Sequence, residues 1–502
     1  MSFRIQAIEL KVMAKKIIFR ADGNSTNGLG HLYRLFSLVE IVKDSYEFVF
    51  LTHESSTNDV IPKAYPTVII PKAIGVEEEP EWIAANLFPE THIIIADGYQ
   101  FTTSYQKEIK AKGYRLVYVD DLVKDHMYAD LVVNHSPYIR EKHYTKEPYT
   151  KLALGTQYAL LRPLFLDEAT KNKTITTIDT AFVCFGGADP YNLTIKAVKG
   201  LLQISNFKTT HVVLGGAYKH EDIFALEAKH SDKLKTYKNL SEEQLIKVMQ
   251  QCNFAIAPAS TILYELSCVK MPILSGYYVG NQKYIYKGLS EKRTIFEGKD
   301  FRNYSVNEFE QKVKLIIESN SIQTYIDHQK SLFDGNSKVR LLGLINGLTI
   351  SFRKAIEEDV LQVFNWSNDV LVRKNSYNSE PIKLENHKKW FHKKIRDENT
   401  LFLIALINNE PAGIVRFEID DSYATVGILV SKSYRGQKLA GEFLKASAKK
   451  YFEIYSVPIL AYIKKDNKAS VKAFESARYT YFKDEIISGC VSFVYKLEKE
   501  DG

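Results

Sequence analysis

The sequence has little cysteine and no long apolar run. Four of the 502 residues are cysteine, and no two of them form a C-x-x-C pair. This scatter disfavours a structural zinc site and a disulfide framework, and it fits a reducing cytoplasm. No apolar run approaches the ~18 residues of a membrane span. The N-terminus has no apolar segment followed by small residues, so no secretory signal is expected, and Met13 is an alternative start to Met1.

Charge of one sign is not concentrated anywhere in the chain. The net charge is +7 at pH 7, but Lys and Arg are spread through the sequence. A nucleic-acid binder would carry a basic block with interleaved aromatic residues, and none is present. A mild positive excess suits small anionic substrates equally well. We therefore expect no nucleic-acid partner and no membrane span.

The order of apolar patterns predicts an α/β protein of about three domains, because 502 residues exceed what one core usually holds. Short β runs such as "KIIFRAD" and "HIIIADGY" alternate with helical patterns from residue 16 to about 340, and this alternation restarts near residue 180. It is typical of parallel sheets built from βαβ units. We predict two Rossmann-like halves, residues 14–155 and 156–345, followed by an α+β domain at 350–500.

The stretch "RADGNSTNGLGHLYR" joins a predicted strand to a predicted helix. A helix N-terminus attracts anions, and Gly28 and Gly30 let the backbone approach a ligand. His31 at the helix start is predicted to point into the ligand cleft, and histidine titrates near neutrality. Arg20 and Arg34 favour an anion by their position. The alternatives are a plain glycine turn, a locally packed histidine and arginines that are solvated or paired.

Four aspartates end predicted strands on the same side as this loop: Asp22, Asp97, Asp120 and Asp121. They are candidates to orient a water molecule, a base or sugar hydroxyls. The alternative is that they only cap the following helices.

The second half carries matching chemistry in "FGGADPYNLT" and "APASTILYELSCVKMPILSGYYVGNQ". Hydroxyls and N–H groups at a helix start are predicted to hold a diphosphate, and a carboxylate one turn deeper to bind two ribose hydroxyls. The alternatives are simple helix caps and a solvated carboxylate. The predicted nucleotide- and sugar-binding residues here are Gly187, Asp189, Asn192, Ser260, Thr261, Glu265, Asn281 and Gln282.

These motifs, with the closing "DGNSKVR", resemble the UDP-sugar hydrolases of pseudaminic acid biosynthesis over roughly residues 14–345. The resemblance implies a glycosyltransferase-B-like fold. It also implies cleavage of UDP from UDP-2,4-diacetamido-2,4,6-trideoxy-β-L-altropyranose, with His31 activating the attacking water and inversion at the anomeric carbon. Pro258 and Ala259 stand where the family usually has glycines. Since UDP is a good leaving group, no second carboxylic acid is expected, unlike in ordinary glycosidases.

The stretch "VGILVSKSYRGQKLAGEFL" resembles the acetyl-CoA pyrophosphate loop of GCN5-related N-acetyltransferases. Arg435 and Ala440 match that pattern, whereas Lys438 replaces its middle glycine. The downstream segment "NKASVKAFESARY" resembles the same family, with a helix cap as the alternative role of its first residue. The acetyl-CoA-binding residues implied by the resemblance are Arg435, Gly436, Gln437, Lys438, Leu439, Ala440, Gly441, Asn467 and Ser470.

The earlier stretch "VFNWSNDVLVRKNSYNSEPIKLENHKKWF" is similar to acetyltransferases that act on 4-amino nucleotide sugars. The resemblance implies an acceptor pocket lined by Trp366, Asn368, His387 and Trp390, although the two tryptophans are equally suited to a core. Glu418, or His387 through water, is the candidate base for the sugar amine. Many relatives carry a tyrosine acid where this chain has Phe474, so thiolate protonation is assigned to Tyr462 or to solvent.

Two domains that resemble successive steps of one pathway predict a cytoplasmic bifunctional enzyme. The expected co-substrate is acetyl-CoA, the expected substrate is a UDP-activated amino sugar, and no metal is expected. Fusion would place the acetylated intermediate at high local concentration for the hydrolase. Two other functions stay open: a nucleotide-sugar glycosyltransferase with an accessory acetyltransferase, and a non-catalytic nucleotide-sugar-binding regulator.

Overall fold

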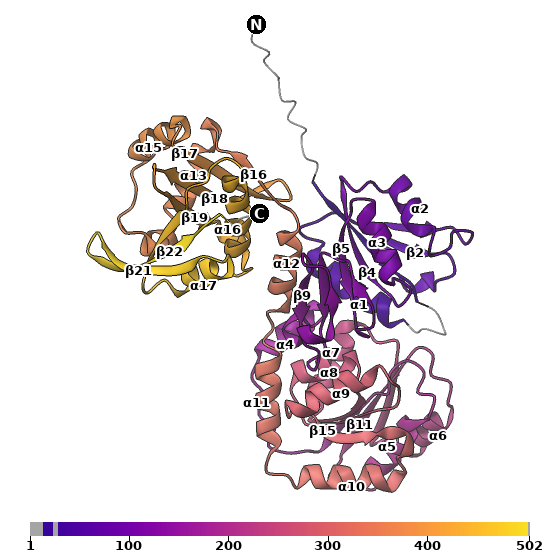
Figure 1. Ribbon diagram of the computed structural model, residues 1–502. Coiled ribbons are helices and arrows are strands. Elements are labelled where there is room, and N and C mark those ends of the chain that lie inside the picture. The colour runs from indigo at the N-terminus through magenta and orange to yellow at the C-terminus, as the bar shows by residue number, and fades with distance from the viewer. Residues whose placement is uncertain (1–13, 24–28, 500–502) are drawn as a thin grey trace. The chain divides into compact units, whose positions relative to one another are not determined.

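The computed structural model describes residues 14–23 and 29–499. The chain divides into two compact units, Lys15–Lys338 and Val339–Gly502, which are coloured from indigo to pink and from orange to yellow in Figure 1. Each unit is described by itself.

The first half of the first unit is built on a parallel sheet. Its strands are buried on both faces, as in Ile17, Ile18 and Ile93–Ile95, which have no exposed surface. Helices α1 and α3 pack on this sheet. In the described residues the sheet runs, in spatial order, β3 (Thr67–Ile70), β2 (Phe48–His53), β1 (Lys16–Ala21), β4 (His92–Asp97), β5 (Arg115–Val119), β7 (Leu131–Asn134) and β9 (Lys151–Leu154).

The other elements of this half lie between those strands. A two-stranded parallel ladder joins β6 (His126–Met127) to β8 (Thr145–Lys146). The helices are α1 (Gly30–Val42), α2 (Glu79–Asn86), α3 (Thr103–Ala111) and the 3-10 turns η1 (Asn58–Val60), η2 (Glu141–His143) and η3 (Thr156–Tyr158).

The second half repeats the same design around a second parallel sheet. Its described strands run, in spatial order, β12 (Leu234–Lys238), β11 (Thr209–Leu214), β10 (Thr180–Val183), β13 (Phe254–Pro258), β14 (Ile273–Tyr277) and β15 (Phe296–Asp300). Its helices are α4 (Pro163–Thr170), α5 (Leu193–Leu202), α6 (Asp222–Lys229), α7 (Glu242–Gln251), α8 (Thr261–Val269), α9 (Gln282–Glu291), η4 (Phe301–Asn303), α10 (Val306–Ile317) and α11 (Ile322–Leu332).

Both sheets follow the Rossmann strand order, in which the chain starts in the middle, moves to one edge and then returns to build the other. The direction reverses between β1 and β4 in the first sheet and between β10 and β13 in the second. Ligands of such folds bind at the carboxyl ends of the strands beside this reversal. The predicted pair of Rossmann-like halves is therefore confirmed, and the fold places a candidate site at each reversal.

The second unit is an α+β domain preceded by α12 (Ser337–Gly347), whose first two residues belong to the first unit. Its described strands run β16 (Ile350–Lys354), β17 (Thr400–Ile407), β18 (Glu410–Ile419), β19 (Ala424–Val430), β20 (Ile459–Lys464), β22 (Cys490–Leu497) and β21 (Thr480–Ile487). The helices are η5 (Glu357–Asp359), α13 (Val360–Ser367), α14 (Val370–Asn375), α15 (Leu384–Arg396), η6 (Lys432–Tyr434), α16 (Leu439–Phe452) and α17 (Lys468–Ser476).

This sheet opens in its middle. Strands β19 and β20 are parallel and pair only at Ala424 with Ile459 and at Thr425 with Leu460. Beyond these pairs each strand stays bonded to its outer neighbour, β18 or β22. The facing edges of the two parted strands consequently carry backbone N–H and C=O groups that do not pair with each other.

None of the helices in the described residues is long and apolar enough to cross a bilayer.

Candidate functional sites

The site in the first half is built around a histidine and an aspartate at the strand reversal. His31 is the second residue of α1, which follows β1, and Asp97 is the last residue of β4. Because β1 and β4 are neighbours, with Ala21 opposite Asp97, the two side chains meet at one edge of the sheet. The Nδ1 atom of His31 lies 2.6 Å from Oδ1 of Asp97.

Arg34, one turn further along α1, holds the same carboxylate. Its Nε donates to Asp97 Oδ2 at 2.8 Å and its Nη2 donates to Asp97 Oδ1 at 2.7 Å. Nη2 also lies 2.8 Å from His31 Nδ1. A carboxylate only accepts hydrogen bonds, so Nδ1 at 2.6 Å from Oδ1 must carry the proton. His31 Nδ1 and Arg34 Nη2 are then both donors to Asp97 Oδ1, which explains why the two nitrogens lie close together. In the neutral ring, the Nε2 atom of His31 keeps its lone pair.

Burial and charge act in opposite directions on this pair. Asp97 is fully buried, which by itself raises the pKa of its carboxyl. The positive charge of Arg34, with the contact to His31, outweighs burial and leaves the pKa of Asp97 below its usual value. Asp97 therefore remains an ionised acceptor that fixes the orientation of the imidazole.

Tyr99 completes this cluster and connects it to the second half. Its ring meets that of His31 edge to face, with centroids 4.6 Å apart. Its hydroxyl donates to Asp121 Oδ2 at 3.2 Å, and the same oxygen accepts from Arg34 Nη1 at 2.8 Å. From the second half, the Nδ2 atom of Asn281 lies 3.5 Å from the Tyr99 hydroxyl. The predicted residues His31, Arg34 and Asn281 are thus brought together.

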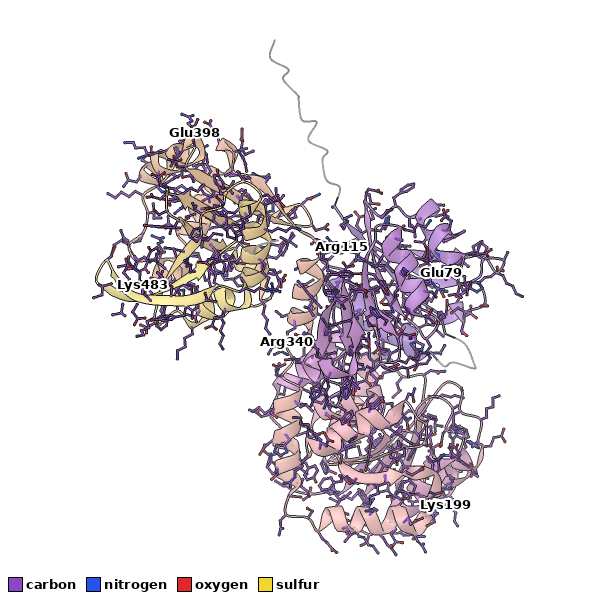
Figure 2. All side chains as sticks on the ribbon, viewed as in Figure 1. Glu79, Arg115, Lys199, Arg340, Glu398 and Lys483 are labelled. Carbon is purple, nitrogen blue, oxygen red and sulfur yellow. The ribbon has the colours of Figure 1, made fainter. Side chains whose placement is uncertain are left out.

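Arg20, which was predicted to bind an anion, has its guanidinium paired with carboxylates inside the protein. Arg20 is 1% exposed, and its Nε and Nη2 donate to the two carboxylate oxygens of Glu79 at 2.7 and 2.8 Å. Glu79 comes from α2 and is labelled in Figure 2. The third nitrogen of Arg20 lies 2.7 Å from Asp22 Oδ1. A buried guanidinium must be neutralised inside the protein, and these carboxylates do so.

Asp22 is likewise occupied by its own surroundings. Its carboxylate accepts from the Thr52 hydroxyl at 3.0 Å, the His53 amide at 2.7 Å and the Gln100 side chain at 3.0 Å. In this structure Asp22 therefore braces the end of β1, and its contact with a sugar stays a prediction. Gly30 begins α1 with open space at its Cα, and Gly28 lies outside the described residues.

In the second half, Asp189, which was predicted to bind nucleotide, caps a helix. It is 1% exposed, and its two carboxylate oxygens accept from the amides of Leu193 and Thr194, each at 2.8 Å. Asn192, in a left-handed conformation with φ 48°, donates through Nδ2 to Asp222 at 3.1 Å. The Asp189 side chain thus caps α5, whereas the Asn192 side chain does not, and the contacts of both residues with a ligand stay predictions. Gly187 has open space at its Cα, which leaves room for a ligand.

The start of α8 differs, because its hydroxyl is not used as a cap. Ser260 is the N-cap residue, but its side chain accepts no bond from the helix, and Thr261 follows as the first helical residue. The Leu263 amide donates to the Ser260 carbonyl at 2.9 Å, but the Ser260 hydroxyl makes no cap, so the start of α8 is a candidate place for an anion.

Two further predicted residues near α8 have internal partners. Glu265 is 8% exposed; burial raises the pKa of its carboxyl, and the Arg162 guanidinium, 2.7 Å away, opposes that effect. The Oε1 atom of Gln282, which was predicted to close over the sugar, accepts from the Tyr278 amide at 2.9 Å, and the residue is 7% exposed.

His135 lies near the same cluster and is buried as a neutral ring. Its Nδ1 accepts from the Leu160 amide at 3.3 Å, and its backbone carbonyl accepts from the Tyr264 hydroxyl at 3.0 Å. Burial, with a smaller contribution from the charge of Arg34, lowers the pKa of His135 to about 4, although Asp121 and Asp97 oppose this. Protonating Nδ1 would also remove the acceptor for Leu160.

This histidine predicts acid sensitivity with a definite sign. In the unfolded chain a histidine takes up its proton near pH 6.5, whereas the folded protein resists protonation of His135 down to about pH 4. Stability is therefore complete above pH 6.5 and falls as the pH drops through this window. From about pH 7.5 to about pH 4.5 the expected loss is roughly 2.5 kcal/mol. His135→Gln should flatten the pH dependence of unfolding followed by circular dichroism, whereas His328→Gln, on α11, should leave it as in the wild type.

In the second unit, a candidate anion site follows the open edge of β19. The chain passes through η6 and Arg435–Lys438 into α16, whose first N–H groups have no capping side chain. Gly436 and Lys438 adopt left-handed conformations with φ 80° and 60°. Glycine adopts the left-handed conformation at no steric cost, so a glycine would suit the position that Lys438 occupies in this chain. Left-handed turns before a helix aim backbone N–H groups at an anion.

The predicted acetyl-CoA residues divide into backbone donors and side chains with other partners. The Arg435 side chain braces the loop, donating through Nη1 to Asp369 at 2.7 Å and through Nε to the Val430 carbonyl at 3.1 Å. Asn467 caps α17 by accepting from the Ser470 amide at 3.2 Å, which is the alternative role expected for it, and its contact with acetyl-CoA stays a prediction. Leu439, Ala440 and Gly441 form the first turn of α16.

Gly441 also permits a close approach of two helices. A Cβ atom at this position would lie 2.1 Å from the Ser476 hydroxyl of α17. The C-terminal part of α17 is thereby packed against the first turn of α16.

The predicted acceptor residues are mostly part of the domain's packing. Asn368 pairs with the backbone of Ile382 through both of its side-chain atoms, at 2.9 and 2.8 Å. Trp366 and Trp390 pack against the apolar cluster around Phe391. Both tryptophans are partly buried, and the contacts of all three residues with a sugar stay predictions.

The two predicted bases differ in what surrounds them. Burial raises the pKa of Glu418, but Lys394 at 2.6 Å and Arg416 at 2.7 Å outweigh it and hold that pKa below its usual value. A carboxylate held by two cations is a poor proton acceptor, which argues against Glu418 as the base, although its role stays a prediction. His387 is 2% exposed; burial lowers its pKa, and its Nε2 has no partner among the described residues.

Sequence reasoning missed several residues of these sites. Tyr99, His135 and Arg162 were not assigned, although "DGYQ" and "NHSPY" directly follow predicted strands. The position of Tyr99 and His135 where predicted strands end is the signal that would have identified them. No group of three or more His, Cys, Asp and Glu side chains in the described ranges is placed to hold a metal ion.

The fold and the sites define a protein that joins two Rossmann-like halves of glycosyltransferase-B type to an acetyltransferase domain. Residues 349–480 match the family model described as "Acetyltransferase (GNAT) domain". Over 500 residues, 92% of this chain and 96% of the relative, the chain is 24% identical to an uncharacterized protein of Methanocaldococcus jannaschii. That alignment spans both units.

Two relatives align with about half of the chain. The UDP-2,4-diacetamido-2,4,6-trideoxy-beta-L-altropyranose hydrolase of Campylobacter jejuni is 27% identical over 284 residues, 55% of this chain and 97% of that protein. The spore coat polysaccharide biosynthesis protein SpsG of Bacillus subtilis is 24% identical over 265 residues, 51% of this chain and 75% of that protein. The predicted resemblance of the N-terminal half to the hydrolase, and its fusion to a GNAT domain, are confirmed.

Proposed function

We propose that the chain is a cytoplasmic bifunctional enzyme of pseudaminic acid biosynthesis. Its second unit transfers acetyl from acetyl-CoA to the amine of a UDP-4-amino-4,6-dideoxy sugar. Its first unit hydrolyses UDP-2,4-diacetamido-2,4,6-trideoxy-β-L-altropyranose to UDP and the free sugar. The observation that carries the hydrolase half is the His31–Asp97 pair at the strand reversal, in a chain segment similar to the Campylobacter hydrolase.

In the hydrolytic step, His31 is the general base. Its Nδ1–H is fixed by Asp97, so Nε2 takes a proton from water while the water oxygen bonds to the anomeric carbon. The bond from that carbon to the UDP oxygen breaks, and UDP leaves with the electron pair. Attack opposite the leaving group inverts the anomeric configuration. The diphosphate charge is spread over the N–H groups that begin α8, beside Ser260 and Thr261.

In the acetylation step, the parted strands and the loop before α16 support acetyl-CoA as donor. An extended arm with amide groups can bond to the open edges of β19 and β20, and its diphosphate can bind the first turn of α16. The sugar amine attacks the thioester carbonyl, the C–S bond breaks, and the amine loses a proton. Of the two predicted bases, His387 keeps an unpartnered nitrogen.

The leaving thiolate needs a proton that Phe474 does not supply. Phe474 is 4% exposed and packs against Tyr479. Burial raises the pKa of Tyr462 on β20, with Tyr423 contributing, so its phenol stays protonated at neutral pH. We assign thiolate protonation to Tyr462.

A product assay with the full chain tests the proposal. The UDP-4-amino sugar with acetyl-CoA should yield UDP and the diacetylated free sugar, and NMR of fresh product should show the inverted anomer. Omitting acetyl-CoA should abolish formation of the diacetylated sugar. Acetylation without UDP release in water contradicts the hydrolase half, and UDP release only when a sugar acceptor is added favours a glycosyltransferase.

A further inference from the structure

Helix α12 contacts the loop that precedes α16, although it lies before the residues matched by the acetyltransferase family model. Gly343 faces Gln437 so closely that a Cβ atom at Gly343 would lie 2.3 Å from the Gln437 carbonyl oxygen. One turn later, Asn346 donates through Nδ2 to Gln437 Oε1 at 2.7 Å. Arg340, labelled in Figure 2, marks the earlier part of this helix.

These contacts act on the part of the loop that turns toward α16. Gln437 lies between the two left-handed residues Gly436 and Lys438, and its own Nε2 donates to the Ser433 carbonyl at 3.3 Å. Asn346 is 2% exposed, and its neighbours Leu341 and Ile345 are also 2% exposed, so this stretch of α12 is anchored in apolar packing. Helix α12 thus supports the loop at Gln437.

We propose that α12 is part of the acetyl-CoA site, with Gly343 and Asn346 as positioning residues that hold the diphosphate-binding loop. This inference rests on the proposed use of acetyl-CoA. Backbone N–H groups bind a diphosphate well only when they are held within about half an ångström of their binding geometry. Gly343 sets the distance of the helix from the Gln437 carbonyl, and Asn346 sets the orientation of the Gln437 side chain.

The test is Gly343→Ala in the full-length chain. The added methyl group must displace the Gln437 carbonyl, because 2.3 Å is far inside contact distance. We expect the Kd for acetyl-CoA, measured by calorimetry, and its KM to rise by at least about tenfold, since small misplacements in a binding site cost about that much or more. The kcat at saturating acetyl-CoA should change less than about twofold, because the reacting atoms are held elsewhere.

A truncated donor separates positioning from general damage. S-acetylpantetheine lacks the diphosphate, so Gly343→Ala should leave its turnover within about twofold of wild type. Asn346→Ala should raise the Kd for acetyl-CoA about fivefold, as for one lost hydrogen bond. The double variant Asn346→Ala with Gln437→Ala should be no worse than the poorer single variant, because both remove the same contact.

The matched control is Gly347→Ala in the same helix, where a Cβ atom would meet only Glu442 Cγ at 4.0 Å. It should bind acetyl-CoA as the wild type does. The inference is overturned if Gly343→Ala and Asn346→Ala both keep the wild-type Kd, if Gly347→Ala weakens binding equally, or if turnover of S-acetylpantetheine falls in parallel. If the wild-type chain does not bind acetyl-CoA, the proposed donor fails and this inference fails with it.

Discussion

His31→Asn is expected to lower the rate of UDP-sugar hydrolysis by about 100- to 10,000-fold, the usual contribution of a general base. The substitution removes the only imidazole that Asp97 orients at the strand reversal in the described residues. UDP is a good leaving group, so activation of water is the part of the reaction that the protein must supply. The measurement is kcat for UDP release from the diacetamido UDP-sugar at saturating substrate.

UDP binding and acetyl transfer should be unchanged in His31→Asn, because the proposed diphosphate and acetyl-CoA sites lie on other elements. His328→Asn, on α11, makes the same chemical change away from the cluster and should hydrolyse as the wild type does. A His31→Asn variant that folds and keeps the wild-type rate would contradict the role of His31 as base.

Asp97→Asn is expected to lower the rate of UDP-sugar hydrolysis by about 100- to 10,000-fold, although Asp97 does not touch substrate in the proposed mechanism. An amide in place of the carboxylate no longer demands the proton on His31 Nδ1, so the other tautomer becomes populated and Nε2 loses its lone pair. The buried Arg34 also loses its closest charge partner, which should lower the free energy of unfolding by about 3 kcal/mol. Hydrolysis rates and thermal unfolding measure the two effects separately.

Asp121→Asn provides the comparison for this second variant. Asp121 also binds Arg34, at 2.8 Å, but it is more exposed and makes no hydrogen bond to His31 that the structure describes. It should lose less than about tenfold in hydrolysis, since the tautomer of His31 is unaffected. Equal losses in the two variants would show that Arg34, and not the tautomer, is what Asp97 controls.

The fold followed from the sequence because its signals are local. Apolar strand runs that alternate with helical patterns, as in "KIIFRAD" and "HIIIADGY", predict parallel sheets, and the repeat near residue 180 predicts the second half. The position of His31 at a helix start was equally local, one residue after the glycine that begins α1. The parting of β19 and β20 depends on the register between distant strands, and no local pattern encodes it.

Side-chain partners were harder to predict, because they join residues far apart in the sequence. In a sheet covered on both faces, the position of Arg20 in a buried strand does not reveal whether its side chain meets ligand or protein. Its partner Glu79 lies 59 residues away. Asp189, by contrast, carried a readable signal, because an aspartate shortly before a helix is a common cap. The sequence of the strand that carries Glu418 does not reveal that Lys394 contacts its carboxylate, or how the charges around that carboxylate balance.

The charges around His31 have a consequence for the energetics of proton uptake. One guanidinium, Arg34, faces two carboxylates, Asp97 and Asp121, so the group carries a net negative charge while the imidazole is neutral. When the imidazole accepts a proton, the group becomes electrically neutral as a whole. The cation that forms during turnover therefore arises in surroundings already polarised to receive it, with little rearrangement of solvent.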